Sequence, residues 1–178
     1  MKHAKKIALG GLLSALSCVL LMMAGMMPFL VFAMPMLAGM LLVPVCAEMN
    51  WKWGYAVYAV VSVLSLLLVA DREAAFFYIG LFGHYAVTKM FLERIRSRPL
   101  RMLSKLLVFA ASVALCLLLT ALTFGLDYLL LEYALFGAWS VPLFGGVGLL
   151  MLGMYDVLLS RLAVLYEKRI RPKIRRML

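Results

Sequence analysis

A long uncharged segment near the start of the chain limits what it can fold into. From Ile7 to Ala47 no side chain is charged. About 20 apolar residues form a helix that crosses the roughly 30 Å hydrocarbon core of a bilayer, since each residue rises about 1.5 Å. The segment is therefore long enough for two crossings, and Pro28 is the expected break between them. A cleaved signal peptide has an apolar core of only about 7–15 residues, so we favour an uncleaved first helix.

The apolar character continues through the rest of the chain. Of 178 residues, 66% are hydrophobic, well above the proportion in a soluble domain. Such an excess does not fit in one small aqueous core and is expected to face lipid. We predict an all-α, polytopic membrane protein that forms one domain over residues 1–178, with Pro35 and Pro44 making its second span the least regular. The six predicted spans are 7–27, 30–47, 53–70, 74–92, 106–126 and 139–163.

The basic residues predict how these spans are oriented. The net charge is +10, from 18 Lys and Arg against 8 Asp and Glu. If the N-terminus is cytoplasmic, every Lys and Arg except Arg72 falls on the cytoplasmic side or at a helix end facing it. Cytoplasmic loops of membrane proteins carry this excess, so we predict that both termini are cytoplasmic. The charge is thus explained by topology and by anionic lipid headgroups of the bilayer, and we expect no nucleic-acid partner.

His84, Lys89 and Asp156 are ionisable residues well inside predicted spans, where an unpaired charge is costly. Asp156 and Lys89 are expected at similar depths, toward the cytoplasmic side. We predict that Asp156 faces the bundle interior and pairs with Lys89 or with Arg161, as a structural ion pair or as part of a functional site. His84 lies near the middle of the fourth span. It is expected to hydrogen-bond a neighbouring helix, with a ligand contact or a proton relay as the alternative.

The sequence carries none of the common catalytic motifs. It has no GxxxxGK[ST] phosphate loop, no HExxH zinc motif and no GxSxG nucleophile motif. There are two His in the chain, one of them at position 3, which argues against a His-based metal site. We therefore expect no enzymatic activity, no resident cofactor and no metal.

Small residues recur on one face of the first span. Ala4, Ala8, Gly11 and Ala15 follow one another at intervals of four, three and four residues, which places them on one side of a helix. In a membrane, small side chains allow helices to approach closely. This face is expected either to pack inside the bundle or to dock a partner subunit.

The first span, together with the size and helix count of the chain, resembles a known family. Lys5 to Leu16, KKIALGGLLSAL, is similar to the basic, alanine-rich first helix of the substrate-binding S components of energy-coupling-factor (ECF) transporters. These small bacterial membrane proteins bind a vitamin or metal ion and borrow a shared transmembrane coupling subunit with two ATPase subunits. The resemblance implies a vitamin-like ligand and a location in the bacterial plasma membrane. It also implies that Ala4, Ala8, Gly11 and Ala15 dock the coupling subunit.

The resemblance further implies a ligand site near the outer membrane face. The residues that could line it are Phe32, Asp71, Arg72, Tyr78, Trp139 and Ser140. Aromatic rings there are expected to stack on a heterocycle, and Arg72 to meet a carboxylate or phosphate. The loop from Asp71 to Glu73 is either a solvated turn or a lid over this cavity.

A scaffold function is the alternative to transport. The chain also resembles the MreD-type membrane proteins of bacterial cell-shape and envelope assembly, which would contact partners through helix faces and hold no ligand cavity. A polar or aromatic outward-facing pocket of a few hundred cubic ångströms favours the transporter component. A tightly packed outer half favours the scaffold.

Overall fold

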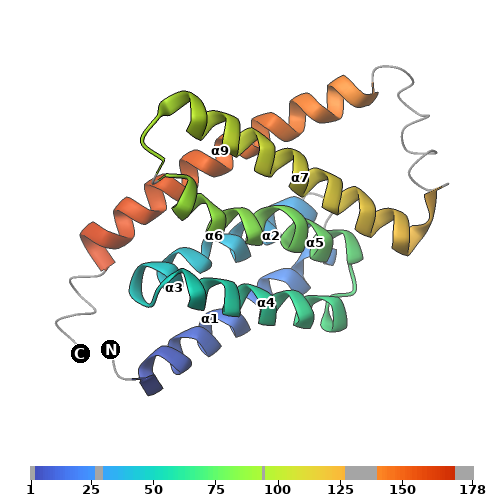
Figure 1. Ribbon diagram of the computed structural model, residues 1–178. Coiled ribbons are helices and arrows are strands. Elements are labelled where there is room, and N and C mark those ends of the chain that lie inside the picture. Colours follow the sequence, from blue (N-terminus) through green and yellow to red (C-terminus); the bar gives the residue numbers. More distant parts are fainter. Residues whose placement is uncertain (1–2, 27–29, 94, 127–139, 171–178) are drawn as a thin grey trace.

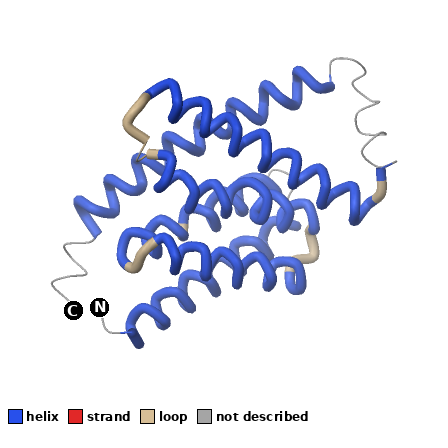
Figure 2. Tube along the Cα trace, in the orientation of Figure 1, coloured by secondary structure: helices blue, strands red, loops and turns tan. Residues whose placement is uncertain are grey.

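The computed structural model describes residues 3–26, 30–93, 95–126 and 140–170, and every element in these ranges is helical (Figure 1, Figure 2). Six stretches are long and apolar enough to cross a membrane, which confirms the predicted all-α bundle of six potential spans. The predicted break at Pro28 lies outside the described residues. The stretches are Lys6–Met26, Leu30–Glu48, Trp51–Leu68, Arg72–Leu92, Arg98–Phe124 and Gly145–Arg169.

The first two spans differ in regularity. Helix α1 (His3–Met23) is continuous and ends in a short 3₁₀ turn, η1 (Ala24–Met26). The second span is divided into α2 (Leu30–Met40) and α3 (Leu42–Glu48). The division falls at Leu41 because Pro44 has no N–H to donate to the carbonyl of Met40, one turn earlier. The second span is thus irregular, as its prolines predict.

Side-chain caps start the next two spans. The Asn50 side chain accepts a hydrogen bond from the N–H of Trp51 at 2.8 Å, where α4 (Trp51–Leu68) begins. The carboxylate of Asp71 accepts from the N–H groups of Glu73 and Ala74, at 3.0 and 3.3 Å, at the start of α5 (Arg72–Phe77). Both caps satisfy N–H groups that lack partners within the helix.

The fourth span contains a π-helical segment at its centre. Helix α5 continues into η2 (Tyr78–Phe82), and η2 continues into α6 (Gly83–Leu92). The Tyr58 hydroxyl on α4 donates to the carbonyl of Ile79 at 2.6 Å, and the Tyr155 hydroxyl donates to the carbonyl of Phe82 at 3.0 Å. A π segment leaves carbonyls available for such bonds. Most of this span is buried, so it forms the centre of the bundle.

Two long helices cover the centre of the bundle and expose most of their surface. They are α7 (Arg98–Phe124) and α9 (Ser140–Leu165), the latter extended by a π-helical turn, η4 (Tyr166–Ile170); they cross in Figure 1. Helix α7 begins at Arg98 and not near residue 106, because Pro99 in its first turn favours a helix start. It ends at Gly125, whose φ of 88° suits glycine.

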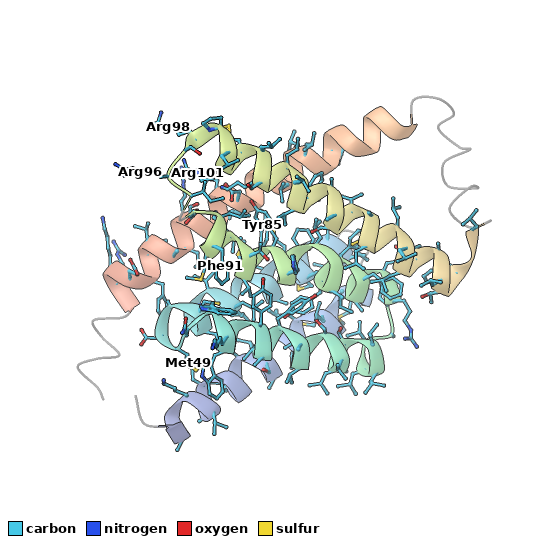
Figure 3. All side chains as sticks on the ribbon, in the orientation of Figure 1. Met49, Tyr85, Phe91, Arg96, Arg98 and Arg101 are labelled. Atoms are coloured by element: carbon cyan, nitrogen blue, oxygen red, sulfur yellow. The ribbon has the colours of Figure 1, made fainter. Side chains whose placement is uncertain are left out.

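The two ends of the bundle differ in charge. The starts of α1, α4 and α7 and the ends of α6 and η4 lie together at one end, which we call the basic end (Figure 1). The side chains of Arg96, Arg98 and Arg101 project from this end (Figure 3). We call the opposite end the distal end; it holds the start of α5 and the end of α7 (Figure 1). Having both the start of α1 and the end of η4 at the basic end fits an even number of crossings. That this end faces the cytoplasm stays a prediction.

Candidate ligand pocket and intramembrane ion cluster

A cavity of about 470 Å³ lies in the distal half of the bundle, between α2, the α5–η2 segment, α7 and α9. Four phenylalanines dominate its walls: Phe32, Phe76, Phe77 and Phe109. Small-molecule sites in proteins typically enclose about 300–1,000 Å³ and are lined mainly by apolar and aromatic side chains. The cavity therefore has the size and lining of a ligand pocket.

Aromatic contacts between helices shape this pocket. The rings of Phe32 on α2 and Phe77 on α5 pack with centroids 4.6 Å apart and planes tilted by 41°. On the other side, a Cβ placed on Gly148 of α9 would lie 3.1 Å from Cζ of Phe109 on α7. The Phe109 ring thus lies against bare backbone, which brings α7 and α9 together along one wall.

The structure places the residues predicted to line the ligand site in different surroundings. Phe32 lines the pocket. Asp71 caps α5, and Nη1 of Arg72 donates to the carbonyl of Leu66 at 2.9 Å. Tyr78 is fully buried in the bundle core, with its ring 6.0 Å from that of Tyr58. Asp71, Arg72 and Tyr78 therefore do not form part of the pocket wall.

Two further predicted lining residues cannot be placed at the pocket. Trp139 lies outside the described residues. Ser140 is the first residue of α9, and its side chain also lies outside what the structure describes.

Glu73 lines the pocket, whereas from the sequence we expected it only in the loop that forms a turn or a lid. It occupies the first turn of α5 and lines the cavity beside the phenylalanines. In the sequence it belongs to the charged loop that starts at Asp71. Once Asp71 is recognised as the cap, Glu73 becomes a helical residue one turn before Phe76 and Phe77, so its side chain shares their face.

An ion cluster joins α6, α7 and α9 nearer the basic end. Nζ of Lys89 lies 2.9 Å from Oδ1 of Asp156, so the predicted pairing of these two residues is observed. The Lys89 side chain also donates to the main-chain carbonyl of Asp156 and, at 2.7 Å, to the hydroxyl of Ser160. The Tyr85 hydroxyl donates to Oδ1 of Asp156 at 2.8 Å. Lys89 is 4% exposed, so its charge depends on these partners.

The second cation of the cluster is Lys105 and not Arg161. Nζ of Lys105 lies 2.6 Å from Oδ2 of Asp156. From the sequence we expected Lys105 at the membrane edge, because the fifth span was predicted to begin near residue 106. Since α7 begins at Arg98, Lys105 lies about two turns inside the helix, at the depth of Asp156.

The ion cluster lies directly next to the pocket. Phe109 follows Lys105 by one turn of α7, and Met151 precedes Asp156 by little more than one turn of α9; both line the cavity. The Lys105–Asp156 pair therefore ties α7 to α9 on the side of the pocket nearer the basic end. The same two helices form much of the pocket wall.

His84 belongs to a separate aromatic group between α4 and α6. Its ring lies 6.3 Å from the rings of Tyr55 and Tyr58. The hydroxyl of Thr88, one turn later on the same helix, is 3.5 Å from the imidazole nitrogens, and it also contacts the Tyr55 hydroxyl at 3.0 Å. The hydrogen-bonded connection from His84 to α4 therefore passes through the Thr88 hydroxyl to Tyr55. His84 does not line the pocket.

The small-residue face of α1 is uncovered. Ala4, Ala8, Gly11 and Ala15 are all exposed, and a Cβ on Gly11 would meet nothing within 4 Å. The buried face of α1 carries Ser14, Ser17 and Leu21 instead. Of the two expectations for the small-residue face, packing inside the described bundle does not occur. The face remains available to another subunit.

Comparison with protein-family models, with curated proteins and with solved structures finds no match to this chain. The pocket and the ion cluster must therefore be interpreted from their own chemistry.

Proposed function

We propose that this chain is the membrane-embedded, substrate-binding subunit of a bacterial uptake transporter of the ECF type, located in the plasma membrane and energised by separate ATPase subunits. The observation that carries the proposal is the aromatic pocket of about 470 Å³ in the distal half of the bundle. If the basic end is cytoplasmic, this half faces outward, where an uptake subunit collects its ligand.

The pocket favours this proposal over a membrane scaffold. A scaffold of the MreD type needs apolar helix faces but no internal cavity, and its outer half is expected to be packed. Here α7 and α9 leave space against α2 and the α5–η2 segment, and phenylalanine rings line that space. Aromatic side chains around a cavity of this size supply binding energy for an organic ligand.

The uncovered face of α1 supports the second part of the proposal, dependence on a partner. The sequence has no phosphate loop with which to hydrolyse ATP, so the energy for uptake would come from other subunits. Exposed small side chains at Ala4, Ala8, Gly11 and Ala15 allow a transmembrane coupling subunit to approach the backbone of α1 closely.

Copurification tests this proposal. The tagged chain is solubilised from its native membrane in mild detergent, and the associated proteins are identified. We expect a transmembrane subunit together with two ATPase subunits carrying phosphate loops, and we expect Gly11→Leu to lower their recovery at least several-fold by blocking close approach.

Gly153→Leu is the matched control, because a Cβ at Gly153 on α9 also meets nothing within 4 Å. It should retain the ATPase subunits. Recovery of envelope-assembly proteins without any ATPase subunit would contradict the transport proposal and support the scaffold.

A further inference from the structure

The polar side chains in the described part of the pocket wall already have partners within the protein. The Thr120 hydroxyl donates to the carbonyl of Cys116 at 3.0 Å, and the Cys116 thiol donates to the carbonyl of Phe76 at 3.4 Å. Glu73 likewise interacts with another group of the protein. A charged group on a ligand would have to compete with these interactions or remain unpaired, which is costly in apolar surroundings.

The positive side chains near the pocket are also engaged elsewhere. Arg72 donates to the carbonyl of Leu66, and Lys105 pairs with Asp156. Neither Arg72 nor Lys105 belongs to the pocket wall. The described wall thus offers no Lys or Arg to an anion, which argues against the carboxylate or phosphate ligand that the sequence led us to expect at Arg72.

Helices α7 and α9 enclose the pocket on the side that faces the membrane. They are joined by the Lys105–Asp156 pair and by the contact between the Phe109 ring and Gly148, and from there they diverge toward the distal end (Figure 1). The lining residues of both helices lie on this diverging part. The pocket is therefore bounded there by two helices that separate from one another.

The exposure of the lining residues shows in which direction the pocket opens. Phe76 and Phe109 are buried, at 4% and 8% exposed, whereas Leu117 on α7 and Val147 on α9 are 37% and 53% exposed. Leu117 and Val147 both belong to stretches that are apolar and long enough to cross a membrane. Leu117 lies about 10 Å from the end of α7 at Phe124, at about 1.5 Å per residue. Aliphatic side chains within membrane spans thus form the rim of the opening.

We propose that the ligand of this pocket is an uncharged, lipophilic molecule that enters from the outer half of the bilayer through the opening between α7 and α9. The phenylalanine rings and aliphatic side chains of the wall would bury its apolar or aromatic body. This inference rests on the proposed function for the role of the ligand in uptake and for the outward direction of the distal half. It narrows the expected vitamin-like ligand to one that dissolves in the membrane.

Three probes with one aromatic body and different charges test the class of ligand. The purified chain, in phosphatidylcholine nanodiscs, is titrated with pyrene, with 1-pyrenemethylammonium and with pyrene-1-carboxylate, and binding to empty nanodiscs is subtracted. We expect saturable binding of pyrene and at least tenfold weaker binding of each charged probe, because an ionic group without a partner is costly to bury. Phosphatidylcholine is in large excess, so saturable pyrene binding also shows that bilayer acyl chains do not occupy the pocket.

Two variants test the place of binding and the route of entry. Val113→Trp puts a large ring into the cavity and should abolish saturable pyrene binding. Val147→Trp narrows the opening at an exposed position, where the core stays intact, and should slow pyrene association at least fivefold in a stopped-flow measurement. Val164→Trp is the matched control, because Val164 is also on α9 and 50% exposed but does not line the pocket. It should associate with pyrene at the rate of the wild type.

The possible contrary results affect different parts of the inference. Binding of either charged probe as tight as that of pyrene would overturn the assignment of an uncharged ligand, and so would the absence of saturable binding by every probe. Pyrene binding that survives Val113→Trp would show that the probe binds elsewhere and would also overturn it. Equal association rates for Val147→Trp and Val164→Trp would overturn entry between α7 and α9. In each case copurification with ATPase subunits still decides the proposed function separately.

Discussion

Asp156→Asn is expected to destabilise the folded protein by about 3–5 kcal/mol, the range found when one partner of a buried ion pair is removed. The substitution leaves Lys89, which is 4% exposed, and Lys105 with no carboxylate at their shared centre. Lys105 would then lose its paired carboxylate, and Lys89 would keep only the more exposed Glu93 carboxylate, 3.5 Å away, inside a membrane-spanning bundle where charge is costly. Thermal unfolding of the purified protein in detergent measures the effect as a large fall in the midpoint temperature.

Two controls make this prediction specific to the ion cluster. Lys52→Met removes a charge from an exposed position on α4 and should change the midpoint little. The triple variant Lys89→Met, Lys105→Met and Asp156→Leu removes the carboxylate together with both lysines and leaves only the half-exposed Glu93, so it should be much more stable than Asp156→Asn alone. A midpoint for Asp156→Asn equal to that of the wild type would show that the cluster contributes nothing to stability.

Gly39→Ala is expected to cost about 1–3 kcal/mol, as overpacking of a well-packed interior does. A Cβ on Gly39 of α2 would overlap the Tyr155 hydroxyl and lie 2.8 Å from the carbonyl oxygen of Phe82. The Phe82 carbonyl accepts the hydrogen bond from Tyr155, so the added methyl group disturbs the contact that joins α2, η2 and α9. Unlike a flexible side chain, the backbone of η2 cannot rotate away.

The same substitution at an open glycine is the comparison. Gly153→Ala adds a methyl group where nothing lies within 4 Å, and alanine favours helix over glycine by about 1 kcal/mol. It should therefore be neutral or stabilising in the same thermal assay. If Gly39→Ala and Gly153→Ala behave alike, the close approach of α2 and η2 at Gly39 is not present in the protein.

The bundle could be predicted from sequence because the bilayer imposes a simple length rule. Uncharged segments of about 20 residues predict the spans. The clustering of basic residues predicts that both ends of the chain lie at the same end of the bundle. The Lys89–Asp156 pair followed from comparing depths along two spans. Lys105 could not be found in this way, since its depth depends on the start of α7 at Arg98, and a basic, proline-containing segment does not resemble a membrane span.

The pocket was predicted less well, because it depends on local caps and on gaps between helices. Arg72 and Glu73 are neighbours in one charged loop, and no periodic pattern decides which of them faces inward. The bonds from Asp71 to the N–H groups of Glu73 and Ala74 fix the start of α5, and with it the direction of each following side chain. Phe32 was predicted from its aromatic character, whereas Phe109 packs against Gly148, where an added Cβ would lie 3.1 Å from its Cζ, and no sequence pattern indicates that contact.

The central claim is that the half of the six-span bundle that holds the pocket faces outward. Labelling of the two bundle ends with a membrane-impermeant thiol reagent tests this claim most directly. Cys18, Cys46 and Cys116 are first replaced by Ala, and single cysteines are introduced as Ser97→Cys at the basic end or Leu126→Cys at the distal end, both at exposed positions. In intact cells we predict that the cysteine at 126 reacts with a maleimide added outside, while the one at 97 reacts only after the membrane is permeabilised. Labelling at 97 from outside, or equal labelling of both sites, would contradict the account.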